Sequence, residues 1–237
     1  HFKNEKVAKA LVQALDDHNE KVAEEAVNSL VELGHLSIQA IEPLFGKKAT
    51  ATAQAKRHAV TVLGKISGNY SNTILRRVLD DGQLGESAAR YLVARTETDP
   101  ISILSQTEEP VQLRLAAAEI LGEEGKEQAI EALLLAIRTP SNPHVLRVAC
   151  IRILKRHKKK QFVIPLISIL VDGSESVDIK TAVIDALTTL GNKRTVEPLI
   201  ELLSSPNLAS RVKVAIIHAL AILGDNSSIK PILPFLE

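Results

Sequence analysis

Apolar positions along this chain recur with the period of an amphipathic helix. In residues 210–225, "SRVKVAIIHALAILGD", they stand at positions i, i+3, i+4, i+7, i+8 and i+11. That spacing places all of them on one stripe of an α-helix. The stripe consists of Val212, Ala215, Ile216, Ala219, Leu220 and Leu223. Residues 210–225 are therefore predicted to form a helix with one face in a hydrophobic core.

The same stripe returns along the chain at regular intervals. It occurs 33 residues earlier, ending at Leu190, and 33 residues before that, where His157 replaces the last leucine. Looser copies lie within 26–35, 55–67, 87–95 and 115–125. The last stripe positions are Leu33, Leu63, Leu92, Leu121, His157, Leu190 and Leu223, with spacings of 29 to 36 residues. A period of this length is typical of an array of repeated structural units.

A second, shorter apolar phrase with a proline follows most copies of the stripe. Its prolines are Pro43, Pro165, Pro198 and Pro231. In the first turn of a helix a proline loses no intrahelical hydrogen bond, so each is predicted to begin a second helix. Between the two helices stand Gly34, Gly64, Gly122, Gly191 and Gly224. We expect them at helix ends, where a positive φ is often needed. Each unit is therefore predicted to be helix A, tight turn, helix B.

Single helix pairs of this kind cannot bury their apolar stripes, so neighbouring pairs must stack into one core. Aromatic residues make up only 3% of the chain and Trp is absent, which favours close-packed helices built from Leu, Ile, Val and Ala. We predict an all-α, right-handed α-solenoid of about seven helix pairs in one domain, 1–237. After a partial unit at 1–17, the expected repeats are 18–46, 47–82, 83–107, 108–140, 141–173, 174–205 and 206–237. Because the chain starts at His1 and contains no Met, we expect it to be trimmed from a longer protein.

The phrase Leu190-Gly191, followed by Val196-Glu197-Pro198-Leu199, resembles the motif of HEAT repeats. It is most similar to the short prokaryotic kind found in phycobilisome (bilin) lyases. The basic residues Arg147, Lys180 and Arg211 early in helix A also fit that family. The resemblance is strong over 141–237 and weak over 65–110. It implies an α-solenoid whose B helices line the concave face, in a family whose members mostly bind other macromolecules.

A minority of proteins in this family are enzymes, and their motifs are absent from the sequence. Enzymes of the deoxyhypusine hydroxylase kind bind iron through His-Glu dipeptides, and none occurs here. HEAT-like DNA glycosylases hold a base with aromatic side chains, but Tyr70 and Tyr91 are isolated and there is no Trp. No P-loop, Rossmann fingerprint, G-x-S-x-G or zinc spacing appears. We expect no catalytic residue, metal or cofactor, and predict that the chain is not an enzyme.

The single cysteine and three histidines favour structural roles over catalysis. Cys150 occupies the repeat position held by Val183 and Ile216, so we expect a buried core residue rather than a nucleophile. His58 and His218 share one repeat position and lack a ligand partner in sequence. His157 is placed to cap a helix end, where a cation is favourable.

Basic residues crowd the turn after the helix that ends near His157. They are Arg152, Lys155, Arg156, Lys158, Lys159 and Lys160. One interpretation is a solvated helix end stabilised by the helix dipole. The other is a contact for an acidic partner or for phosphates. Residues 1–140 hold 16 Lys/Arg and 20 Asp/Glu, net −4, whereas 141–237 hold 13 and 8, net +5. This asymmetry could orient a partner or promote self-association.

The exposed positions predicted for the B helices change from unit to unit while the core positions stay apolar. They are Glu42, Thr73, Arg77, Glu131, Ile164, Ser168, Glu197, Glu201 and Lys230. Exposed positions also vary without any function. A variable surface on a repeated frame is nevertheless typical of the binding groove of a solenoid, so we predict a partner-binding groove there.

These observations predict a protein-interaction scaffold or adaptor that binds another protein along the concave helix B face. One cysteine suits a reducing compartment, so a cytoplasmic location is expected. No apolar run approaches the roughly 20 residues of a membrane span, and a net charge of +1 does not indicate nucleic acid. Two alternatives stay open. The resemblance suggests a lyase, isomerase or chaperone-like factor for a bilin-bearing protein. The basic C-terminal half suggests phosphate-backbone binding, which salt would weaken steeply.

Overall fold

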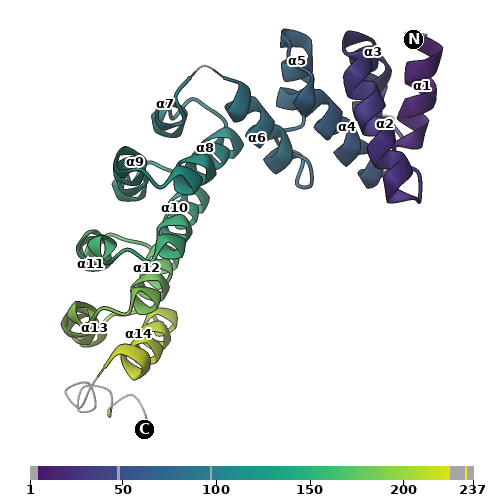
Figure 1. Cartoon of the computed structure of the whole chain (residues 1–237). Helices are drawn as coiled ribbons and strands as arrows, with labels where there is room; N and C mark the ends of the chain where they lie inside the picture. Colours follow the sequence, from purple (N-terminus) through teal and green to yellow (C-terminus); the bar gives the residue numbers. More distant parts are fainter. Residues whose placement is uncertain (1–4, 47–48, 97, 225–232, 234–237) are drawn as a thin grey trace. The chain divides into compact units, whose positions relative to one another are not determined.

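A computed structural model describes residues 5–46, 49–96, 98–224 and 233. In this part of the chain the backbone forms fourteen α-helices and three short 3₁₀ helices, and no strand occurs (Figure 1). The prediction of an all-α solenoid is therefore confirmed. The chain divides into two compact units, which are described separately. The first comprises 1–103 and 108–117, and the second comprises 104–107 and 118–237.

The first unit contains six complete helices. They are α1 (Glu5–Ala14), α2 (Glu20–Leu33), α3 (His35–Ile41), α4 (Ala53–Lys65), α5 (Asn69–Arg77) and α6 (Gly85–Arg95). Helix α2 packs against α1, α3 and α4, and α4 packs against α5 and α6. Side-chain caps fix two of the starts, because Asn19 accepts a hydrogen bond from the N–H of Lys21 and Thr52 accepts one from that of Ala55. The core is aliphatic, as the composition predicted, and includes fully buried Leu30, Ile38, Leu63 and Leu75.

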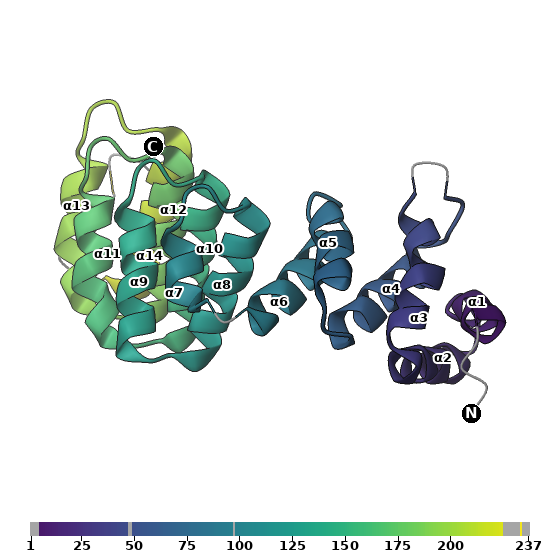
Figure 2. The ribbon, with the colours of Figure 1, turned by 90° about the horizontal axis from the view of Figure 1, so that it is seen from above.

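The second unit contains α9 (Glu127–Arg138), α10 (His144–His157), α11 (Val163–Leu170), α12 (Val177–Leu190), α13 (Val196–Leu203) and α14 (Ser210–Leu223). Helix α7 (Pro100–Ser105) and helix α8 (Val111–Glu124) lie where the two units meet in the sequence. Helices α10, α12 and α14 form one layer of the second unit, the A layer. Helices α9, α11 and α13 form the other, the B layer (Figures 1 and 2). Each B helix packs on an A helix: α9 on α10, α11 on α12 and α13 on α14.

The predicted A helices are confirmed, since every repeated stripe from 26–35 to 210–225 falls in a helix of the structure. Most stripe positions are buried: Leu146, Ile179 and Val212 begin the last three stripes and are at most 1% exposed, whereas the next position, Ala149, Ala182 or Ala215, is half-buried. Cys150 is fully buried in α10, as its repeat position predicted.

The proline prediction is confirmed at two positions and wrong at a third. Pro165 and Pro198 are the third residues of α11 and α13, in the first turn. Pro43 instead stands in the 3₁₀ helix η1 (Glu42–Phe45), which follows α3. Helix α3 starts directly after Gly34, so the proline arrives at its end and converts the last turn to 3₁₀ geometry. Pro231 lies outside the described residues.

The glycine prediction holds at Gly34 and Gly191, whose φ values are +64° and +65° at helix ends. It is wrong at Gly64 and Gly122, which lie inside α4 and α8. There the missing side chain permits close packing: a Cβ on Gly64 would lie 2.3 Å from Tyr91 Cδ2, and one on Gly122 would lie 2.4 Å from Ile153 Cγ2. Gly224 follows α14 with φ −69°, in the extended region, so no positive φ is required there either.

A buried ion pair connects two neighbouring repeats of the second unit. Arg147 of α10 donates from Nε to the carbonyl of Ile137 at 2.6 Å and from Nη2 to Glu175 in the loop between α11 and α12. The two charged side chains are only 4% and 8% exposed. One guanidinium therefore joins the end of α9, the start of α10 and the loop of the next repeat.

Candidate partner-binding surface

The outward face of the B layer presents nine exposed side chains in three parallel rows. Each helix contributes residues four and then three positions apart, which lie on one face. They are Glu131, Leu135 and Arg138 of α9, Ile164 and Ser168 of α11 with Val171 directly after it, and Glu197 and Glu201 of α13 with Ser204 directly after it. Equivalent residues on neighbouring helices are 33 positions apart. We call this set the helix B surface.

Three large aliphatic side chains of the helix B surface face solvent. Leu135 is 63% exposed, Ile164 57% and Val171 54%. Single exposed aliphatic residues are normal on soluble proteins. Here two of the three belong to one face of α11 and the third lies on the adjacent α9, so the apolar area is shared by two neighbouring helices. In the repeat register the three aliphatic positions therefore adjoin Ser168, the middle position of the nine.

Three carboxylates and one arginine, Arg138, share the surface with these aliphatic side chains. Glu131, Glu197 and Glu201 are exposed, and none forms an ion pair with another described residue. The carboxylates of the A layer differ, because Asp178 and Asp185 each bind a cation of the adjacent helix. The helix B surface thus combines exposed aliphatic side chains with three carboxylates and one arginine, which leaves an excess of negative charge.

Of the nine groove residues predicted from the sequence, five lie on this surface: Glu131, Ile164, Ser168, Glu197 and Glu201. The first unit contains Glu42, Thr73 and Arg77. There Arg77 Nη1 donates to Glu42 at 2.8 Å, and the Thr73 hydroxyl donates to the backbone carbonyl of Asn69 at 2.9 Å. Lys230 lies outside the described residues.

Glu42 is engaged by two donors rather than free to receive a partner. The Tyr70 hydroxyl donates to one of its carboxylate oxygens and Arg77 to the other. The hydrogen bond from Tyr70, and then that from Arg77, lowers the pKa of Glu42 below its ordinary 4.5. The same hydrogen bond raises the pKa of Tyr70. The arrangement therefore connects η1 to α5 within the first unit.

The sequence prediction missed Leu135, Arg138, Val171 and Ser204. In the apolar run Leu133-Leu134-Leu135 the first member is buried and the last is exposed, which the residue types alone do not reveal. A signal was available, since Leu135 lies 33 residues before Ser168 and Val171 lies 33 before Ser204. Applying the repeat period to the B helices, as was done for the A helices, would have placed these residues in exposed positions.

The basic cluster at 152–160 does not form one uniform patch. Lys155 binds Asp185 of α12 at 2.7 Å, and Arg156 binds Glu119 of α8. The ammonium of Lys159 lies 3.4 Å from the carbonyl of Gly125. Three of the six cations thus contact neighbouring segments, whereas Arg152, Lys158 and Lys160 are exposed. A contact of this cluster with an acidic partner stays a prediction.

The ion pairs of the A side form a ladder across successive repeats. Glu119 of α8 pairs with Arg156 of α10, Lys155 of α10 with Asp185 of α12, and Asp178 of α12 with Arg211 of α14 at 2.8 Å. Each step joins residues 30 to 37 positions apart. Because these pairs are largely exposed, each contributes little stability by itself, about 0–1 kcal/mol.

Among the described residues, the histidines do not stand in an arrangement typical of a catalytic or metal site. His58 bonds to the carbonyl of Leu15 through Nδ1 at 2.8 Å, and its Nε2 lies 3.4 Å from Glu20. His157 is half-buried at the end of α10, and His218 is exposed on α14. Nowhere in the described ranges do three or more His, Cys, Asp or Glu side chains gather as metal ligands. None of the described helices has the length and apolar character required to cross a membrane.

Comparison with known proteins identifies repeats in the C-terminal third. Residues 163–237 match the family model of HEAT repeats. No curated protein matches the chain. Among solved structures, human deoxyhypusine hydroxylase in complex with glycerol is 18% identical with a TM-score of 0.42, covering 98% of this chain and 90% of that one. YibA of Escherichia coli is 18% identical with a TM-score of 0.46, covering 98% and 89%. The matched segment, residues 163–237, which includes α11 to α14, is therefore assigned to HEAT repeats.

Proposed function

We propose that this chain is a non-enzymatic interaction scaffold that binds another protein through the helix B surface. The observation that supports it is the combination of exposed Leu135, Ile164 and Val171 with three carboxylates that form no ion pair with a described residue, all on one face of neighbouring helices. A solenoid repeats its frame and varies its exposed side chains, and this suits recognition of an extended partner.

The chemistry of the surface indicates what the partner carries. Covering an aliphatic side chain completely gains about 1.5–3 kcal/mol, so the three aliphatic residues can supply much of the binding free energy. Burying Glu131, Glu197 or Glu201 without a cation would cost more than that gain. The partner segment therefore has apolar side chains flanked by Lys or Arg. A lyase-like activity on a bilin-bearing protein, or phosphate-backbone binding, has no comparable observation in its favour.

The first test is site-specific photo-crosslinking in nuclease-treated lysate of the source cell. A photoreactive amino acid at Ser168 samples the helix B surface, and one at Thr189, exposed on α12, samples the A layer as the matched control. We expect one protein to be crosslinked at Ser168 and not at Thr189, with a segment of alternating apolar and basic residues at the crosslink. Equal capture at both positions, or capture of nothing, would contradict the proposal. Capture of a second copy of this chain would replace it with self-association.

A pair of charge variants separates local recognition from bulk charge. The test variant changes Glu131, Glu197 and Glu201 to Lys. The control changes three exposed carboxylates of the first unit, Glu24, Glu32 and Glu86, to Lys and has the same net charge. We expect the test variant to lose the crosslink at Ser168 and the control to keep it. Loss in both variants would indicate a non-specific electrostatic association.

A further inference from the structure

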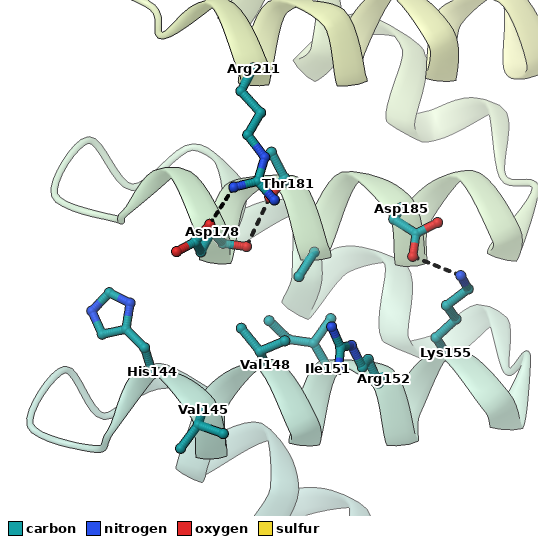
Figure 3. A pocket seen from close by; sticks show the side chains of 11 residues that line it. His144, Val145, Val148, Ile151, Arg152, Lys155, Asp178, Thr181, Asp185 and Arg211 are labelled. Carbon is teal, nitrogen blue, oxygen red and sulfur yellow. Dashed lines mark hydrogen bonds and ion pairs between the residues drawn. The ribbon is translucent and has the colours of Figure 1, made fainter.

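A groove of about 490 Å³ lies on the A layer between α10 and α12 and extends to α14 (Figure 3). Its volume falls within the roughly 300–1,000 Å³ range of ligand sites. The residues that line it come from three successive A helices: Val145, Val148, Ile151, Arg152, Thr181, Ala182 and Arg211 among them. The groove therefore belongs to the face of the second unit opposite the helix B surface.

The groove has an aliphatic floor. Ile151 is fully buried, Val148 and Ala182 are half-buried, and Val145 extends the apolar strip at one end with 56% exposure. In Figure 3, Val148 and Ile151 point from α10 toward α12. Such a floor accepts the side chain of an aliphatic residue and gains free energy by excluding water from it.

Most charged side chains around the floor form ion pairs with one another. Asp178 pairs with Arg211, Lys155 pairs with Asp185, and Nδ1 of His144 lies 3.2 Å from the hydroxyl of Ser176. Arg152 stands on α10 in the same groove, and it forms no ion pair or hydrogen bond with another described residue. Among the charged residues that line the groove, Arg152 is thus the one without an ion-pair partner among the described residues, and it stands beside the aliphatic floor.

We infer that this groove binds a carboxylate-bearing aliphatic segment of a protein, with the carboxylate on Arg152 and the aliphatic side chain on the accessible parts of Val148 and Ala182. A guanidinium can hold a carboxylate by two parallel hydrogen bonds. A phosphate dianion fits less well, because Asp178 and Asp185 line the same groove and would repel its second negative charge. This second site prefers the opposite charge from the helix B surface, so it goes beyond the proposed function and can fail independently of it.

The test is a fluorescence anisotropy titration of the full chain with a fluorescein-labelled peptide of alternating Glu and Leu. A peptide of alternating Lys and Leu is the charge control. The variant Arg152→Gln removes the guanidinium. As the matched control, Arg194→Gln removes an exposed arginine from the 3₁₀ helix Lys193–Thr195 that precedes α13. A third variant, Ala182→Leu, fills the floor without changing charge. Thermal unfolding by circular dichroism checks that each variant is folded.

We expect the Glu–Leu peptide to bind to the full chain. The dissociation constant of the Lys–Leu peptide should be at least about tenfold higher. Arg152→Gln should weaken Glu–Leu binding by about tenfold or more, the effect of losing hydrogen bonds to a charged group. Ala182→Leu should weaken it similarly, and Arg194→Gln by less than about twofold, since a surface charge outside a contact matters little. Equal losses for Arg152→Gln and Arg194→Gln, displacement of the peptide by millimolar inorganic phosphate, or no binding of the Glu–Leu peptide would overturn the inference.

Discussion

Replacing Arg147 by Met tests whether the buried ion pair holds neighbouring repeats together. Methionine keeps an unbranched apolar stem but is shorter than arginine and has no guanidinium. Two bonds disappear, one from Nε to the carbonyl of Ile137 and one to Glu175. Each hydrogen bond to a charged group contributes about 1.5–3 kcal/mol, so the sum is about 3–6 kcal/mol. Leaving one member of a buried ion pair without its partner costs about 3–5 kcal/mol, and this range agrees with the sum of the two hydrogen bonds.

The assay is urea unfolding followed by circular dichroism, for Arg147→Met, Glu175→Gln and the double variant. We expect Arg147→Met to lower the free energy of unfolding by about 3–5 kcal/mol, because Glu175, only 8% exposed, keeps a buried charge. The double variant has no such charge and should lose less than the single Arg147→Met variant. Hydrogen exchange of the loop around Glu175 should also become faster, since Arg147 reaches it from the preceding repeat.

Two results would refute this reasoning. A loss below about 1 kcal/mol for Arg147→Met would mean that water replaces the guanidinium without penalty. Additive effects in the double-mutant cycle, with a coupling energy below about 0.5 kcal/mol, would mean that the two side chains do not act as a pair.

Three further substitutions test local features. Gly122→Ala should destabilise the chain by about 1–3 kcal/mol in urea, because the new Cβ would lie 2.4 Å from Ile153 Cγ2, whereas Gly173→Ala has open space and should change little. Tyr70→Phe should raise the pKa of Glu42 toward 4.5 in a carboxyl NMR titration. Its low pKa gives stability that is fully present above the unfolded pKa and is lost as the pH falls to the folded pKa. In the variant the loss should therefore be smaller and should be complete at a higher pH, while its onset stays the same. Pro198→Ala should shift the urea midpoint very little, since the first turn needs no N–H there; a loss above about 1 kcal/mol would contradict that reading.

The A helices could be predicted well because their burial is strict. A residue such as Val183 or Ile216 is fully buried, so its position tolerates few residue types and the 33-residue period becomes visible. The B helices are shorter and bury one side only, so the same letters can be core or surface, as Leu135 shows. In residues 35–45, Pro43 did not mark the start of helix B, because α3 already begins directly after Gly34.

The site was harder to predict because it depends on contacts between units of the repeat. The sequence suggested that Lys155 and Arg156 belong to an open basic cluster. In the structure their partners, Asp185 and Glu119, come from the next and the previous A helix. Such pairs lie 30 and 37 residues apart and become predictable only when the stacking register is known. The same holds for Gly64, whose packing against Tyr91 no local pattern reveals.

The ion-pair ladder has a consequence for how the length of this array can change. Its charges alternate from helix to helix: Glu119 on α8, cations on α10, Asp178 and Asp185 on α12, and Arg211 on α14. Deleting one helix pair, α11 with α12, would set the cations of α10 beside that of α14 and remove two pairs together. Duplicating the two units from α9 to α12 would keep all three pairs, and Asp185 would precede the second copy of Arg156 by 37 residues, the separation of Glu119 and Arg156. Duplication within the gene for this segment is therefore expected to preserve the ladder in steps of two repeats and to interrupt it in steps of one.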